Sequence, residues 1–135
     1  MTYQLEEPFF EEKGRITAQK EIGGGKTQVT YSSNGTIKGN IEVTNAGDFV
    51  SVSKGNKGTS AQGQGVVTTK DGGEKANYTF IQVGKTDEDK LVVCSCAVWS
   101  TDSTGKLAFL DNMLSFFKVE LDERGNFSST DRELK

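Results

Sequence analysis

The chain has 135 residues, of which 26% are charged, and a formal net charge of −3 at neutral pH. This length suits a single domain with one hydrophobic core. The acidic balance, without basic residues gathered in any segment, argues against nucleic-acid binding, which needs cations on one face to displace counterions from phosphates. No apolar run approaches membrane-spanning length and the first residues do not resemble a secretory signal, so we expect a cytoplasmic protein that does not bind membranes.

Residues 1–13 contain the only proline and surround Phe9 and Phe10 with glutamates. This segment does not alternate as the rest of the chain does. We therefore expect it to be an N-terminal extension that docks on the outside of a β-barrel domain formed by residues 14–135.

From residue 15 onward, apolar residues recur at every second position, as in Leu91, Val93, Ala97 and Trp99. A period of two is what a sheet with one buried face requires. Glycine-bearing turns such as Asn34-Gly35 separate the alternating runs. The expected strands are residues 15–22, 27–32, 36–44, 49–53, 61–70, 74–83, 90–100, 113–122 and 127–132.

Residues 106–111 break the alternation, because Leu107, Phe109 and Leu110 fit a single helical turn. We expect this turn to plug one end of the fold. Eight or nine consecutive antiparallel strands build either a sandwich or a closed up-and-down barrel, and we favour the barrel because closure removes exposed strand edges. The fold class is therefore all-β. A barrel of about eight strands is either filled by side chains or holds one small ligand.

Two glycine motifs resemble nucleotide-binding loops only in part. The run from Gly23 to Thr27 is similar to the end of a phosphate-binding loop, but Lys20 occupies the position of the first glycine, and a strand pattern follows where a helix is required. Gly63-Gln64-Gly65 lies within a strand pattern and has no helix after it. We interpret the first motif as a hairpin turn and the second as a strand bend.

The only cysteines, Cys94 and Cys96, lie two apart on an expected strand, where their side chains run parallel. A disulfide between them would need a distorted strand, so we expect two reduced thiols in or near the core; redox or soft-metal binding is the alternative, and it would need further ligands. The acidic run Asp87-Glu88-Asp89 lacks the spacing of a calcium loop and is interpreted as a solvated turn. No metal site and no cofactor are predicted.

Carboxylates are the only plausible acid–base groups, because the chain has no histidine. The alternation directs Glu42, Glu120 and Asp122 outward, so no catalytic residue is predicted. Interior polar groups, which would bind a ligand or one another, are expected on the fifth and sixth strands. The candidates are Gln62, Gln64, Thr68, Asn77 and Gln82.

Three segments carry a resemblance to a known family: GRITAQK at residues 14–20, GQGVVTTKDG at 63–72 and TGKLAFLDN at 104–112. Together they resemble small uncharacterised microbial proteins whose fold is similar to the allene oxide cyclase and calycin-type barrels. The resemblance implies a barrel, but it implies no particular reaction, substrate or cofactor.

The leading hypothesis is a non-catalytic barrel that binds a small, partly apolar molecule at one open end. Aromatic side chains of the alternating runs are the candidate ligand-binding residues, namely Tyr31, Phe49, Tyr78, Phe80, Trp99 and Phe117. One alternative is an enzyme that steers a reactive intermediate toward one cyclised or isomerised product, which predicts a deep cavity with a buried carboxylate or water site. The other is an interaction module in which Phe9, Phe10 and the outer sheet face bury against a second copy.

Overall fold

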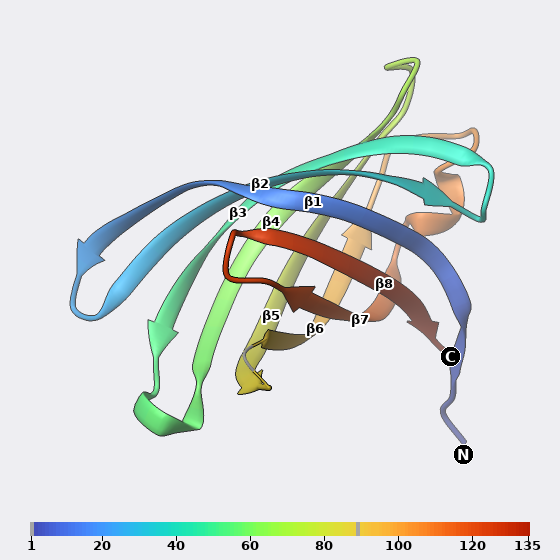
Figure 1. Ribbon diagram of the computed structural model, residues 1–135. Helices are drawn as coiled ribbons and strands as arrows, with labels where there is room; N and C mark the ends of the chain where they lie inside the picture. Colours follow the sequence, from blue (N-terminus) through green and yellow to red (C-terminus); the bar gives the residue numbers. More distant parts are fainter. Residues whose placement is uncertain (1, 89) are drawn as a thin grey trace.

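Eight antiparallel strands close into a barrel in the computed structural model, which describes residues 2–88 and 90–135 (Figure 1). Each strand pairs with its neighbours in sequence, and β8 closes the barrel by pairing with β1. The strands are β1 Leu5–Gly23, β2 Lys26–Ile37, β3 Ile41–Ser53, β4 Thr59–Thr69, β5 Lys75–Asp87, β6 Lys90–Ser100, β7 Met113–Leu121 and β8 Asn126–Leu134. The predicted all-β up-and-down barrel is confirmed.

Two 3-10 turns are the only helical elements of the described residues, η1 at Gly55–Lys57 and η2 at Ala108–Leu110. None of the described helical segments is long and apolar enough to cross a bilayer. The second turn is the one expected at residues 106–111. Leu107 and Leu110 are fully buried in the core cluster, so this segment plugs one end of the barrel (Figure 1).

The segment expected to lie outside the barrel is instead part of its wall and core. Leu5 to Lys13 form the first half of β1, and the rings of Phe9 and Phe10 are buried. Phe9 packs edge-on against Trp99 and Phe109, with ring centroids 6.1 and 6.0 Å apart. Phe9 and Phe10 are therefore not free to bind a second copy. The expected extension is wrong for residues 5–13. Packing of the phenylalanine rings at the plug end stabilises a strand here, although Pro8 and the glutamates disfavour one.

Two expected turns also lie inside strands. β2 continues through Asn34-Gly35 to Ile37, and β3 runs unbroken across residues 45–48, so the barrel has eight strands and not nine. The chain turns instead at Lys38 and Gly39, both of which have positive φ. Gly35 is needed inside the strand because a Cβ there would lie 2.8 Å from the ring of Phe10.

Inward-facing glycines give the interior aromatic rings their space. A Cβ at Gly47 would overlap the phenol of Tyr31, and one at Gly65 would overlap the phenol of Tyr78. Gly63 and Gly65, which were expected at a strand bend, both lie inside β4.

The two cysteines lie on the outer face of β6, where Cys94 is exposed and Cys96 half-buried, and both are free thiols. The expectation of core thiols is wrong, because Val93, Ser95 and Ala97 take the inward positions of that strand. Of the acidic turn at residues 87–89, Asp89 lies outside the described residues.

Candidate functional site

A cavity of about 260 Å³ occupies the barrel interior between the plug and the opposite end. Its walls are mostly apolar and include Val29, Phe49, Phe80, Phe117 and Phe127 from five of the strands. Its floor, on the side of the plug, is polar: Glu12, Tyr31, Asn45, Tyr78 and Ser129. Since a water molecule takes about 30 Å³ in the liquid, the space suits a molecule no larger than roughly nine waters.

Half-buried residues line the cavity at the end far from the plug, among them Ile16, Thr27, Ser51 and Leu121. These positions lie next to the β1–β2, β3–β4 and β7–β8 turns, on the side of the barrel opposite η2 (Figure 1). The cavity therefore opens at one end only.

Glu12 is the charged group at the floor, and it is 8% exposed. Its Oε1 accepts hydrogen bonds from the Ser33 hydroxyl and, at 2.9 Å, from Asn45 Nδ2. Its other oxygen, Oε2, accepts none from the described part of the chain. Side chains of β2 and β3 thus bind one oxygen of this β1 carboxylate, and the other oxygen is left for the cavity.

The two tyrosines of the floor join the same network. The Tyr78 hydroxyl donates to Asn45 Oδ1 at 2.8 Å, and it lies 2.5 Å from the Tyr31 hydroxyl. Because Tyr78 has a single hydroxyl proton and gives it to Asn45, the proton between the tyrosines must come from Tyr31. The Tyr31 oxygen is left with lone pairs only.

A second buried carboxylate lies behind the floor. Asp131 on β8 is 3% exposed, and Ser115 and Trp99 are buried near it. The indole Nε1 of Trp99 donates to Ser115 Oγ at 2.9 Å. The hydroxyl of Ser129, which lines the cavity, is buried; it lies near enough to Asp131 to lower the pKa of that carboxyl, but no hydrogen bond of ordinary length and angle joins it to a described residue.

The surroundings of both carboxyl groups raise their pKa values. Burial raises the pKa of Glu12 above its ordinary value, against the hydrogen bonds from Ser33 and Asn45 that lower it. Burial, followed by the charge of Glu12, raises the pKa of Asp131 well above its ordinary value, and the Ser115 hydroxyl opposes this. Burial also raises the pKa of Tyr31 and Tyr78, so both remain neutral phenols.

The aromatic residues predicted from the sequence all face inward, and five of the six line the cavity: Tyr31, Phe49, Tyr78, Phe80 and Phe117. Trp99 does not. It lies behind Tyr78, with ring centroids 4.7 Å apart, and belongs to the packed core near the plug. The rings of the cavity contact one another, as Phe80 and Phe117 do at 5.8 Å.

Of the polar residues expected inside, only Gln82 lines the cavity. Gln62, Gln64 and Asn77 are exposed on outward positions, and Thr68 is half-buried and lies away from the cavity. The outward positions of Glu42, Glu120 and Asp122 are confirmed. The functional polar residues that the sequence analysis missed are Glu12, Ser33, Asn45, Ser129 and Asp131.

A signal for the missed residues was present in the parity of the strands. Counting back from Ile16 in steps of two reaches Glu12, and counting forward from Phe127 reaches Asp131. Glu12 was missed because it fell in the expected extension, and Asn45 because it fell in an expected turn.

The glycine run that is partly similar to a phosphate loop forms the β1–β2 turn, as interpreted, with Gly23, Gly24 and Gly25 all at positive φ. No group of three cysteine, aspartate or glutamate side chains within residues 2–88 and 90–135 is arranged to hold a metal ion.

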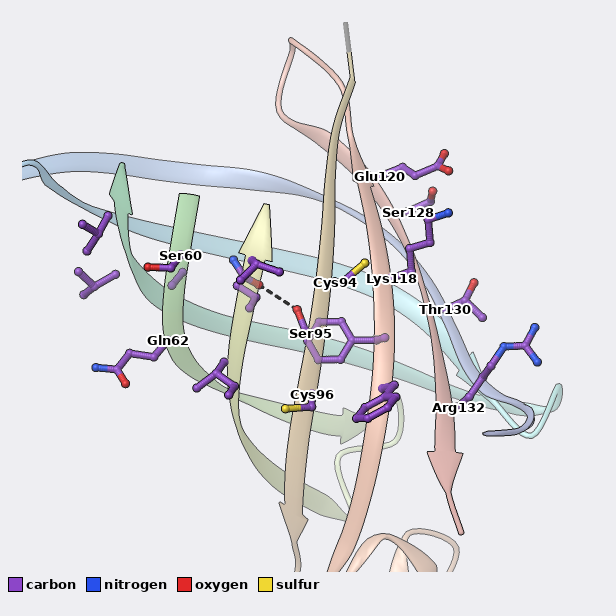
Figure 2. Close-up of a pocket in the computed structure, with 18 of the residues that line it drawn as sticks. Ser60, Gln62, Cys94, Ser95, Cys96, Lys118, Glu120, Ser128, Thr130 and Arg132 are labelled. Carbon is purple, nitrogen blue, oxygen red and sulfur yellow. Dashed lines mark hydrogen bonds between the residues drawn. The ribbon is translucent and has the colours of Figure 1, made fainter. Parts of the chain in front are cut away.

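A larger hollow of about 1180 Å³ lies mainly on the outer sides of β3 to β8 (Figure 2). Ile81, Val83 and Phe116 expose apolar surface there, with exposed fractions of 60%, 53% and 40%. Figure 2 shows Lys118, Glu120 and Arg132 along one side of it. No side-chain network like that of the barrel floor joins these residues, apart from the Ser95–Gln82 hydrogen bond at 3.2 Å. We therefore take the interior cavity as the candidate site.

No protein-family model and no curated protein matches the chain. Solved structures do. A conserved protein of unknown function from Rhodopseudomonas palustris aligns with a TM-score of 0.77 at 13% identity, covering 98% of this chain and 99% of that one. A beta-barrel like protein from Acinetobacter baumannii gives 0.78 at 13% identity, covering 100% and 98%. A protein with unknown function from Clostridium acetobutylicum gives 0.76 at 10% identity, covering 99% and 100%.

At these identities the likeness shows the fold alone. The neighbours are small uncharacterised β-barrel proteins, which agrees with the architecture that the family resemblance implied. A relation to allene oxide cyclase or calycin-type barrels is not tested by them. Any functional argument therefore has to come from the cavity of this chain.

Proposed function

We propose that this barrel binds one small, partly apolar molecule in its interior cavity. The observation that supports this is the contrast within a single space, where aromatic and aliphatic walls end at a floor of buried polar groups. Ligand sites typically combine a mostly apolar lining with a few polar groups that fix orientation. A core evolved only for stability would gain from apolar residues at the floor, because burying a carboxylate is costly.

The volume and the lining residues of the cavity limit the kind of ligand that it can bind. Its volume of about 260 Å³ lies at the lower end of ordinary ligand pockets. The rings of Phe49, Phe80, Phe117 and Phe127 would face the apolar part of the ligand, and Glu12 would face its polar group.

Ligand binding can be tested by blocking the cavity mouth. Ser51 is inward and half-buried near the mouth, whereas Thr44 is exposed on the outer side of the same strand. A panel of small aromatic and aliphatic metabolites is screened for a rise in Tm, since ligands that bind the native state stabilise it by about 2.7 kcal/mol at a hundredfold excess over Kd. We expect hits with the wild type and Thr44→Phe, and loss of those hits with Ser51→Phe.

Fluorescence of Trp99 gives an independent readout, because Trp99 stacks on Tyr78 and Tyr78 lines the floor. A panel without any hit in either assay would argue against the proposal, as would hits that Ser51→Phe leaves unchanged.

A second candidate function is acid–base catalysis of a cyclisation or isomerisation. It is favoured by one observation, the carboxylate of Glu12 at the floor of a one-ended cavity, because a buried carboxyl with a raised pKa is suited to proton transfer near neutral pH. Unsaturated substrates that fit the cavity should then react faster with the wild type than with Glu12→Gln. Rates no faster than in buffer would contradict this candidate.

A further inference from the structure

Most of the hydrogen-bond donors of the cavity floor are already used within the protein. Tyr31 donates to Tyr78, Tyr78 donates to Asn45, and the Asn45 amide donates to Glu12. The Ser33 hydroxyl also donates to Glu12. The floor therefore offers a ligand mainly acceptors, namely Glu12 Oε2 and the lone pairs of Tyr31.

An independent observation points to a missing hydrogen-bond partner. The Ser129 hydroxyl lines the cavity, is 6% exposed and makes no hydrogen bond of ordinary length and angle to a described residue. A buried polar group without a partner is destabilising, so this position calls for an occupant. Such an occupant can satisfy Ser129 by donating to its oxygen.

The charges around the cavity have one sign. Glu12 lines it and Asp131 is buried behind it, whereas no lysine or arginine is among the residues that line it. The walls and floor present six aromatic rings from Tyr31, Phe49, Tyr78, Phe80, Phe117 and Phe127. Aromatic faces attract cations, most strongly where water is excluded.

We propose that the ligand of this cavity is a small organic cation, an amine whose ammonium group donates to Glu12 and Ser129 while its apolar part lies among the aromatic rings. This inference rests on the proposed binding function and specifies its ligand class. An ammonium group supplies three donors and a positive charge, which matches a floor of acceptors and carboxylates. An organic anion would meet the opposite arrangement and should be excluded.

The test compares three probes of nearly equal shape: 2-phenylethylamine, 2-phenylethanol and 3-phenylpropanoate. Their Kd values are measured at neutral pH by calorimetry, with Trp99 fluorescence as a second readout. For the wild type we expect the amine to bind at least about tenfold more tightly than the alcohol, since a charge-assisted hydrogen bond exceeds a neutral one by roughly 1–1.5 kcal/mol. The carboxylate probe should not bind.

Two variants test whether the cavity floor causes the preference for the amine over the alcohol. Glu12→Gln should reduce the preference for amine over alcohol to about twofold or less while leaving the alcohol Kd within a factor of about three, because the amide keeps the shape and loses the charge. Glu120→Gln removes an equal charge from the outer face of β7 and should leave all three values unchanged.

An alcohol that binds the wild type as tightly as the amine would overturn the cation inference and leave the binding function standing. So would an amine preference that survives in Glu12→Gln. If none of the three probes binds, the cation inference also fails, and the binding function is then decided separately by the metabolite panel and the Ser51→Phe block.

Discussion

The direction of the hydrogen bonds at the cavity floor predicts that Tyr78→Phe and Tyr31→Phe, which are the same chemical change, lower the free energy of unfolding by different amounts. Tyr78→Phe removes the donor to Asn45 Oδ1 and the acceptor for the Tyr31 hydroxyl at once. Both abandoned groups are buried, with Asn45 4% and Tyr31 8% exposed. Tyr31→Phe removes one donor only, and Tyr78 keeps its bond to Asn45.

An unpaired buried polar group costs about 1–3 kcal/mol, and the cavity beside the floor can admit water, so we take the lower end for each group. Tyr78→Phe should then lower the free energy of unfolding by about 2 kcal/mol, and Tyr31→Phe by about 1 kcal/mol. For a chain of this size these changes correspond to a fall in Tm of roughly 7 °C and 3.5 °C. Tyr3→Phe, at a 67% exposed position, is the matched control and should change nothing.

Calorimetry and urea unfolding followed by circular dichroism measure both quantities, and the doubly substituted protein closes a thermodynamic cycle. Because Tyr78→Phe leaves the Tyr31 hydroxyl unpaired, removing that hydroxyl as well should recover about 1 kcal/mol, which gives a coupling of about 2 kcal/mol. A larger cost for Tyr31→Phe than for Tyr78→Phe, or fully additive effects, would refute the direction of the chain.

Three further substitutions test other parts of the structure. Gly65→Ala places a methyl group against the Tyr78 phenol and should destabilise the barrel by about 2 kcal/mol, seen as a lower urea midpoint, whereas an unchanged midpoint would show that the ring has room to move. Glu74→Ala removes the carboxylate that accepts hydrogen bonds from the Leu107 backbone amide at 3.0 Å and from the neighbouring residues of the plug, so hydrogen exchange at that amide should speed up while β2 amides stay protected. Burial raises the pKa of Asp131 in the folded state, so the stability it contributes is present below its unfolded pKa and is lost as pH rises through its folded pKa. Asp131→Asn should therefore gain in Tm relative to the wild type as the pH rises above about 4, and a constant difference would contradict this.

The barrel could be predicted from the sequence because alternation is a local signal that each strand carries on its own. The alternation predicted strands correctly at Leu91–Trp99 and Phe117–Leu121 without knowledge of the strands with which they pair. The errors arose where a local turn motif conflicted with packing against a residue distant in the sequence. Gly35 resembles half of a hairpin turn, yet the ring of Phe10 on another strand needs the space that only glycine leaves.

The site could be predicted only on its apolar side. Aromatic residues such as Tyr31 and Phe80 stand out in the alternating runs, and they do line the cavity. The polar floor could not be found the same way, since a glutamate or asparagine on a strand usually faces water. That Glu12 and Asn45 meet depends on the register of β1 and β3 with β2, the strand between them, and no local pattern encodes this register.

Packing near the plug also determines the geometry of the cavity floor. Trp99 is held by a hydrogen bond to Ser115 and by the ring of Phe10, with centroids 6.4 Å apart, so the packed core next to the plug fixes the indole against which Tyr78 packs. Tyr78 in turn orients Asn45, and Asn45 orients Glu12. A rigid apolar end of the barrel therefore determines where the carboxylate oxygen lies in the cavity, and preorganisation of this kind lowers the entropy lost when a ligand binds. The buried polar network costs stability, and a floor built in this way is better explained by recognition than by folding alone.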